Sequence, residues 1–348
     1  MGHFPVCTMV ATTVVVSGAA GQVGYSLLPQ LCGGHVLGPK TRINLRLLDI
    51  PQSLEVMEGV KMELLDCAYD LVDDITLTTD AEVAFKGANI AILLGGFPRK
   101  AGMERKDLIA KNTAIFKVQG EAIEKVADRD IKVLVVANPA NTNCLVCMRH
   151  APSIPTKNFS ALMRLDHERM RSLLTVKINE TCGANTVTST EVQNCIIWGN
   201  HSATQVPDAS YVTIKKDGES KPLSAYYNDE AWLHGSLMTD VQQRGAAIIK
   251  ARKLSSALSV ASAIKGHMQA WLYGSSEVVS MGILSNGNKH GIPENIIFSF
   301  PMRCHGDAQV SIADEMTISP ALDKLVKATT DELLSEKADA ASILGMTL

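Results

Sequence analysis

The chain lacks several features that would place it in whole classes of protein. Its 348 residues contain no run of 18 apolar residues, so the sequence predicts no membrane-spanning helix. Neither sign of charge dominates, because 33 basic and 36 acidic residues leave a net charge of −3, and no basic surface is predicted for nucleic acid. Eight cysteines are scattered without a dense framework, so we expect free thiols in a reducing compartment.

Recognisable targeting signals are also missing. The N-terminal stretch "MGHFPVCTMVATTVVVSGAAG" is apolar, but it has no basic region and runs directly into a glycine-rich turn. It therefore predicts a first β-strand and not a signal peptide. The two ends match no myristoylation, retention or peroxisomal motif. We expect a cytoplasmic protein.

The first part of the chain alternates short β-rich runs with helical patterns. Apolar residues make up 46% of the chain and charged residues 20%, and the length allows two domains of ordinary size. The runs "TTVVVS", "INLRLLD", "NIAILLG" and "KVLVVAN" are continuous apolar strands separated by amphipathic segments. Such strands are typical of a parallel sheet covered on both faces. Residues 1–157 are therefore predicted to form a Rossmann-type, doubly wound α/β domain that binds a dinucleotide.

The second part follows a different pattern after the seam "APSIPTKN". We expect residues 158–348 to form an α+β domain that binds substrate and carries the catalytic groups. Its predicted elements are a helix over about 166–179, a strand over 193–198, a hairpin around "IKKDGESKP", two helical segments covering about 229–272, antiparallel strands in "EVVSMGILSNG" and "ENIIFSFPMRC", and a terminal amphipathic helix.

Three glycines mark the junction of the first strand and the first helix. "VVVSGAAGQVGYSLL" places Gly18, Gly21 and Gly24 in a G-x-x-G-x-x-G spacing, with Ala20 where the second glycine of G-x-G-x-x-G would stand. Glycine allows the backbone to approach a pyrophosphate closely, and the helix N-terminus offers free N–H groups to it. Ordinary tight turns also use glycine, but the strand–helix position favours dinucleotide binding.

An acidic residue follows the second strand in "LRLLDI". Asp49 could accept hydrogen bonds from the ribose hydroxyls of adenosine, and its charge would repel a 2′-phosphate, which favours NAD over NADP. The alternative is a helix cap or a turn residue.

Three other stretches hold polar residues that each have two interpretations. "GGFPRKAGMERKDLI" carries Arg99 and Arg105 in a glycine- and proline-flanked loop, which is either a lid over a substrate or plain surface charge. "LMRLDHERM" places Asp166 and Arg169 one helical turn apart, as facing site residues or as a surface ion pair. His201 in "WGNHSATQ" is a solvated loop residue unless distant residues supply it with partners.

These stretches together resemble the lactate/malate dehydrogenase family, and within it the cytosolic-type malate branch. The resemblance covers nearly the whole chain through "GAAGQVGYSLL", "LLDI", "PRKAGMERKDL", "NPANTNCL", "RLDHER", "IIWGNHSATQ" and "VQQRGAAIIKARKLSSALS". In malate enzymes of the family the first arginine of the loop motif is present, as Arg99 is here, whereas lactate enzymes carry glutamine.

The resemblance implies a role for each site residue. His201 would be the catalytic acid–base, oriented by Asp166. Arg169 would bind the C1 carboxylate of the substrate, Arg105 would polarise the C2 carbonyl, and Arg99 would bind the distal carboxylate.

Asn138 would position the substrate hydroxyl and the nicotinamide together. The resemblance also implies a substrate contact at Ser256 and cofactor contacts at Gly18, Gly21, Gln22, Val23, Gly24, Asp49, Asn112, Gln119, Val136 and Asn138.

The implied cofactor is NAD, and the implied substrates are malate and oxaloacetate. The resemblance also implies a homodimer, and "YSLLPQL", "VKMELLDC" and "KARKLSSALS" offer apolar residues beyond the needs of one core. No metal, nucleic-acid or membrane partner is expected. Two other functions stay open: a 2-hydroxy acid dehydrogenase for another substrate, such as an aromatic 2-oxo acid, and a non-catalytic NAD-binding protein.

Two features depart from the pattern or are not used by it. The stretch "KINETCGANTVTSTEVQNCII" is longer than the usual family connection and is expected to lengthen a surface loop. Cys144 and Cys147 form C-x-x-C without a second pair, which favours a packed helix face over zinc or redox chemistry.

Overall fold

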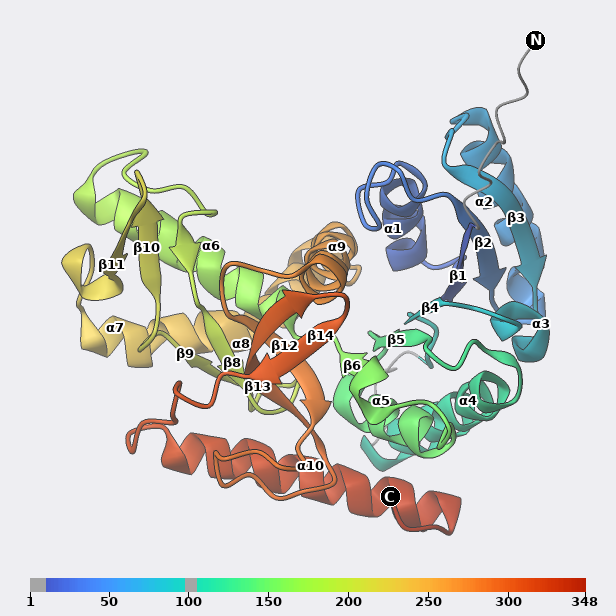
Figure 1. Cartoon of the computed structure of the whole chain (residues 1–348). Coiled ribbons are helices and arrows are strands. Elements are labelled where there is room, and N and C mark those ends of the chain that lie inside the picture. The colour runs from blue at the N-terminus through green and yellow to red at the C-terminus, as the bar shows by residue number, and fades with distance from the viewer. Residues whose placement is uncertain (1–10, 98–104) are drawn as a thin grey trace.

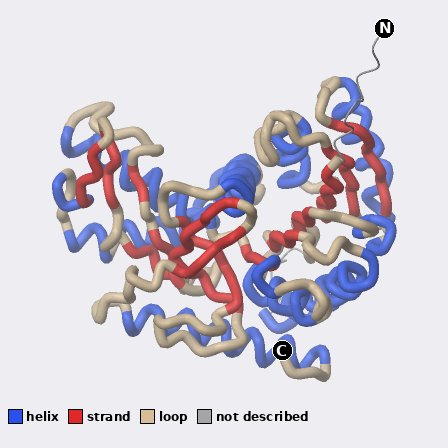
Figure 2. Tube along the Cα trace, viewed as in Figure 1, coloured by secondary structure: helices blue, strands red, loops and turns tan. Residues whose placement is uncertain are grey.

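A single nine-stranded sheet connects the two halves of the chain. The computed structural model describes residues 11–97 and 105–348. The strand order is β14-β13-β12-β6-β5-β4-β1-β2-β3, so the sheet extends from one lobe into the other (Figures 1 and 2). The strands are β1 (Thr12–Ser17), β2 (Ile43–Leu48), β3 (Val72–Thr78), β4 (Ile90–Leu93), β5 (Lys132–Val135), β6 (Phe159–Ala161), β12 (Val279–Leu284), β13 (Ile297–Gly306) and β14 (Gln309–Ile312).

The first six strands are parallel and confirm the predicted doubly wound sheet. Strand β1 pairs with β2 on one side and β4 on the other, and the chain winds outward in both directions from this point. The gap between β1 and β4 is therefore the topological switch point, where sheets of this kind bind ligands. The helices of this half are α1 (Gln22–Cys32), α2 (Leu54–Asp66), α3 (Ala81–Phe85), α4 (Arg105–Val126) and α5 (Ala140–Arg149).

The apolar run in β1 explains why both faces of the sheet are covered. Val14 and Val16 are fully buried in a core that includes Leu27 of α1. Val15 points to the opposite face and is fully buried in a second core with Phe116 of α4. Because successive side chains of a strand alternate between faces, a continuous apolar run requires helices on both sides.

The second half adds an antiparallel extension, small sheets and helices. Strands β12, β13 and β14 pair antiparallel, as predicted for the first two. A third core lies between α6 and the small sheets. The remaining elements are α6 (Arg164–Cys182), β7 (Val192–Gln193), β8 (Ile196–Trp198), β9 (Val206–Asp208), β10 (Thr213–Lys216), β11 (Glu219–Pro222), α7 (Glu230–His234), α8 (Ser236–Arg252), α9 (Leu258–Tyr273), α10 (Asp323–Leu344) and the 3₁₀ turns Pro51–Ser53, Thr156–Asn158 and Leu223–Ala225.

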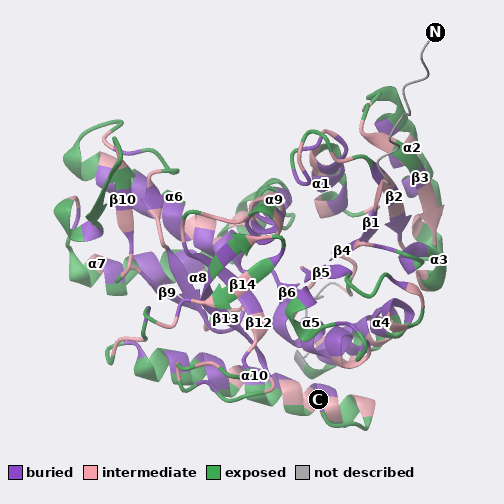
Figure 3. Ribbon diagram, in the orientation of Figure 1, coloured by how far each residue is buried: buried purple, intermediate pink, exposed green. Residues whose placement is uncertain are grey.

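The terminal helix α10 touches both halves of the molecule. It contacts α4 and α5 of the first half and β9 and β13 of the second, along one end of the structure (Figure 1). One face of the helix is buried and the other is exposed (Figure 3). Among the described residues, no helix is both long and apolar enough to cross a membrane.

Two predictions of elements differ from the structure. The two helical segments expected over about 229–272 are three helices, α7, α8 and α9. The strand expected over 193–198 is two short strands, β7 and β8, because Asn194 between them has a φ of +60°. Its side chain holds this kink by donating to Thr213 Oγ1 and accepting from the Val278 N–H. Strand β6 pairs with β5 beyond residue 157, and the exact division of the two domains stays a prediction.

Candidate active site

The glycine turn after β1 is packed so closely that larger residues do not fit. Gly18 has a φ of +69°, and a Cβ there would lie 2.6 Å from the backbone of Gly95. A Cβ on Gly24 would lie 2.4 Å from the carbonyl oxygen of Ala19, so α1 is packed onto the turn. Gly21 is the N-cap of α1 and has no side chain to cover the N–H groups of the first helical turn. This turn fits a pyrophosphate.

Asp49, which follows β2, accepts a hydrogen bond from the same turn. Its Oδ2 accepts a hydrogen bond from the Ala20 N–H at 3.0 Å, and its Oδ1 accepts one from the Ile50 N–H at 2.8 Å. The alternative interpretation as a turn residue therefore describes part of its role. Each carboxylate oxygen can accept more than one hydrogen bond, so the predicted ribose contact is still available and stays a prediction.

His201 has the partners that a solvated loop residue would lack. Its Nδ1 lies 2.5 Å from Asp166 Oδ2, and Asp166 Oδ1 accepts a hydrogen bond from Arg169 Nη1 at 2.8 Å. Asp166 is fully buried, whereas the side chains of His201 and Arg169 are 15% and 12% exposed. The predicted ion pair of Asp166 and Arg169 thus exists, but it lies inside the protein.

The buried carboxylate of Asp166 stays ionised. Burial acts to raise its pKa, but the charge of His201 and its hydrogen bond, the charge of Arg169 and a hydrogen bond from Gln205 together outweigh burial and lower the pKa. An ionised Asp166 accepts the proton on Nδ1 of His201, which leaves Nε2 for proton exchange with a substrate.

The backbone of His201 is held by a residue of the first half. Asn141, in the first turn of α5, accepts a hydrogen bond from the His201 N–H at 3.0 Å. Its amide nitrogen donates to the carbonyls of Gly199 and Ile297. The sequence reasoning did not identify Asn141, although the motif "NPANTNCL" contains it.

A cavity of about 510 Å³ brings most of the predicted site residues together. It lies beyond the carboxyl ends of β4 and β5 and against α8 and α9, as expected for the switch point. Two polar atoms of its wall, Arg169 Nε and Ser256 Oγ, are buried without a hydrogen-bond partner among the described residues. They are therefore available to a polar ligand. The predicted residues in the wall are Val23, Val136, Asn138, Arg169, His201 and Ser256.

Other predicted cofactor residues do not line this cavity. The side chain of Asn112 is fully buried and holds the segment after β4, because it bonds both the N–H and the carbonyl of Phe97. Gln119 is buried in α4. Gln22 lines a separate cavity next to Tyr25. Cofactor contacts by these three residues stay predictions.

The two arginines of the expected lid differ in position. Arg99 lies outside the described residues. Arg105 lies in helix α4 and not in the loop, which corrects the sequence prediction. The side chain of Arg105 lies outside the described part of the structure.

The C-x-x-C pair is part of the core. Cys144 and Cys147 are fully buried on α5, and burial raises the pKa of Cys147 to about 12 and that of Cys144 well above its usual value. This agrees with the predicted packed helix face. The cysteines of the described segments are free, and no group of three or more metal-binding side chains occurs there.

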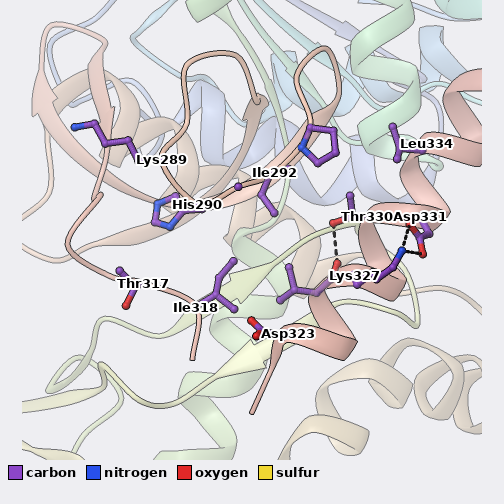
Figure 4. A pocket seen from close by; sticks show the side chains of 13 residues that line it. Lys289, His290, Ile292, Thr317, Ile318, Asp323, Lys327, Thr330, Asp331 and Leu334 are labelled. Carbon is purple, nitrogen blue, oxygen red and sulfur yellow. Dashed lines mark hydrogen bonds and ion pairs between the residues drawn. The ribbon is translucent and has the colours of Figure 1, made fainter. Parts of the chain in front are cut away.

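A second cavity of about 510 Å³ lies apart from these residues, at the start of α10 (Figure 4). Its two lysines are paired, Lys327 with Asp331 and Lys289 with Asp314. None of the predicted site residues lines it.

A dinucleotide fold, an aspartate-bound histidine and a buried arginine beside one cavity define a nicotinamide-dependent dehydrogenase. The chain belongs to the lactate/malate dehydrogenase family: its NAD binding domain model matches residues 12–160, and its alpha/beta C-terminal domain model matches residues 163–343.

Individual relatives agree over nearly the full length. The chain is 46% identical to "Malate dehydrogenase, cytoplasmic" of Zea mays, over 95% of this chain and 98% of the relative. Malate dehydrogenase from Naegleria fowleri has a similar structure, with a TM-score of 0.89 and 43% identity over 96% and 99% of the chains. Lactate dehydrogenase of Trichomonas vaginalis in complex with NADH and oxamate has the same TM-score at 34% identity, over 96% and 99%.

Proposed function

We propose that this chain is an NAD-dependent malate dehydrogenase that interconverts malate and oxaloacetate, with His201 as the catalytic acid–base. The observation that carries the proposal is the contact of His201 with the buried Asp166, beside Arg169, in the wall of the cavity at the switch point. The relatives named malate dehydrogenase support it.

Each residue of the cavity has a chemical task in this proposal. Bound NAD supplies the acceptor for the hydride that leaves C2 of malate. His201 Nε2 takes the hydroxyl proton, and Asp166 stabilises the imidazolium that results. In the reverse direction, protonated His201 donates to the carbonyl oxygen of oxaloacetate. Asn138, in the cavity wall between the two halves, orients the substrate oxygen next to the nicotinamide.

Recognition of a dicarboxylate follows from the arginines. Arg169, with Nε unpaired and buried, binds the C1 carboxylate that all 2-oxo acids share. Arg99 binds the second carboxylate, which lactate and aromatic substrates do not have. Fold similarity does not decide between these substrates, since relatives of both names have a TM-score of 0.89. The identity of residue 99 favours malate.

The proposal includes the cellular setting and the assembly. The name of the maize relative supports a cytoplasmic enzyme of malate metabolism, whose reaction is also a step of the tricarboxylic acid cycle. Exposed apolar side chains on α1, α2 and the segment before α9 support a homodimer. Asp49 supports a preference for NAD over NADP.

NADH oxidation with oxaloacetate, pyruvate and phenylpyruvate tests the proposal. We expect kcat/KM for oxaloacetate to exceed the other two by several orders of magnitude. Faster reduction of phenylpyruvate would favour the aromatic 2-hydroxy acid alternative, and NADH binding without turnover of any of the three would favour a non-catalytic NAD-binding protein.

A further inference from the structure

The loop that carries His201 rests on a row of polar side chains from the terminal helix. Thr329 Oγ1 accepts a hydrogen bond from the Asn200 N–H at 2.9 Å. One oxygen of Glu332 accepts from three groups of the loop, Asn200 Nδ2 at 2.8 Å, Ser202 Oγ at 2.5 Å and Thr204 Oγ1 at 2.6 Å. Helix α10 therefore fixes the loop on the side away from the cavity.

Glu336 connects this row to the other half of the molecule. Its Oε1 accepts from Asn200 Nδ2 at 3.0 Å, and its Oε2 accepts from the hydroxyl of Thr142. Glu336 is 2% exposed, and Thr142 and Asn200 are buried as well. Thr142 lies in the first turn of α5, next to Asn141, which holds the backbone of His201. One carboxylate thus bonds both the histidine loop, at Asn200, and helix α5, at Thr142.

We propose that Glu336 is a positioning residue for catalysis. It fixes the position of the His201 loop relative to α5 and to the nicotinamide side of the cavity. This inference rests on the proposed dehydrogenase activity. The two halves of the site come from different parts of the chain, and α10 is an element that contacts both. A buried carboxylate accepts strong hydrogen bonds, so it fixes the loop more tightly than apolar packing does.

The geometry separates the effect of Glu336 on turnover from its effect on binding. Arg169, which binds the substrate carboxylate, lies on α6, and the glycine turn and Asp49 lie near β1 and β2. Asn200 and Thr142, which donate hydrogen bonds to Glu336, adjoin His201 and Asn141 instead. Loss of Glu336 should therefore change kcat and leave the KM for oxaloacetate and the Kd for NADH nearly constant.

The test compares Glu336→Ala with Glu336→Gln and with the control Asp331→Ala. The Glu336→Gln substitution preserves the shape of the side chain, since the oxygen of the new amide can accept from Asn200 and its nitrogen can donate to Thr142. Asp331 is on the exposed face of the same helix, paired with Lys327 (Figure 4). Steady-state kinetics with oxaloacetate and NADH, fluorescence titration of NADH, and thermal unfolding are measured for each full-length variant.

We expect Glu336→Ala to lower kcat by about 10- to 100-fold, as misplacement of a catalytic group by about 1 Å does. The KM for oxaloacetate and the Kd for NADH of Glu336→Ala should stay within about threefold of the wild-type values. Glu336→Gln and Asp331→Ala retain the geometry of the site, so their kcat should stay within about threefold of the wild type. A kcat of Glu336→Ala equal to that of Asp331→Ala would overturn the proposal, and so would equal losses in Glu336→Ala and Glu336→Gln.

Thr142→Val serves if Glu336→Ala does not fold. It removes one hydrogen bond and keeps the shape, and we expect kcat to fall by about 3- to 10-fold with KM unchanged. A wild-type kcat in Thr142→Val would contradict the proposal. Failure of the proposed function is distinguishable from failure of the Glu336 proposal, because it would appear in the wild type as the absence of oxaloacetate turnover. The variants are then compared on whichever 2-oxo acid the wild type reduces.

Discussion

Asp166 is the residue on which the charges of the site converge. Both of its oxygens are bonded, one to His201 and one to Arg169, and no part of it is exposed. An ionised carboxylate in the interior is stable only when it is paired in this way. The same contacts that orient the imidazole therefore also contribute to the stability of the fold.

Substitution Asp166→Asn should affect both activity and acid stability. The neutral amide cannot stabilise the imidazolium, and we expect kcat to fall by about 10²- to 10⁴-fold. The pKa of Asp166 is lowered in the folded state, so its stabilisation is present above the ordinary carboxyl pKa of about 3.9 and is lost as the pH falls through the lowered value. The gap in Tm between wild type and variant should thus be largest near pH 7 and shrink below about pH 4. A gap that does not depend on pH would mean that Asp166 contributes no charge to stability.

In the proposed function, Arg99 and Arg169 bind opposite ends of the substrate. Arg99→Gln should cost oxaloacetate about 3–5 kcal/mol of transition-state binding, hence roughly two to four decades in kcat/KM, and should leave pyruvate unchanged or improved. Arg169→Gln should damage both substrates alike, because both have the C1 carboxylate. The ratio of the two kcat/KM values in each variant is the deciding measurement. Equal losses for both substrates in Arg99→Gln would mean that Arg99 only shapes the loop.

At the scale of elements, the junction of β8 and α10 positions the histidine loop. Gly199 follows β8 with a φ of +94°, and a Cβ there would lie between 2.3 and 2.9 Å from side-chain atoms of Thr329. Two constraints thus require glycine at this position, the left-handed backbone and the close approach of α10. The hydrogen bonds that the next residue, Asn200, donates to Thr329 and Glu336 of α10 depend on that approach.

Replacement of Gly199 by alanine should move α10 away from the loop. We expect the free energy of unfolding to fall by more than the roughly 1–2 kcal/mol that a left-handed alanine costs alone, and kcat to fall as well. Gly218→Ala is the matched control: its φ is +83°, in the turn between β10 and β11, and nothing lies within 4 Å of its Cβ position. Urea unfolding and kcat are compared for the two variants. The same loss of stability in both, with normal kcat, would show that contact with α10 is irrelevant.

The elements that carry strong periodicity were predictable, whereas the contacts between distant elements were not. The apolar strands β1, β4 and β5 and the glycine turn follow directly from local pattern. His201 and Asp166 are 35 residues apart, and only the family resemblance paired them. Thr142 and Glu336 are 194 residues apart, and a glutamate on an amphipathic helix is ordinarily expected to be exposed to solvent. A signal was present, because Glu336 falls on the helix face of the buried residues Val326 and Leu333.

At the scale of the whole molecule, an exposed apolar surface lies beside the glycine turn. It includes a cavity of about 820 Å³ between α1, α2 and the start of α9. Residues Ala257 and Leu258 of this surface directly follow Ser256, which lines the active-site cavity. The large apolar side chains that are exposed and line this cavity are Tyr25, Val56 and Leu258.

We expect this surface to be the interface of a homodimer, because clustered exposed apolar side chains on a monomer mark sites of association. Light scattering at micromolar concentration should give about twice the chain mass of 37.4 kDa. Leu258→Asp places a charge where the side chain is 75% exposed in the single chain, so the monomer tolerates it and the dimer does not. Val118→Asp, at a residue 55% exposed on α4, is the control and should stay dimeric.

A wild-type mass near 37.4 kDa would contradict the dimer, and a dimeric Leu258→Asp would place the interface on another surface. Since the interface adjoins Ser256, the monomeric variant should also lose part of its kcat, which links assembly to the geometry of the active site.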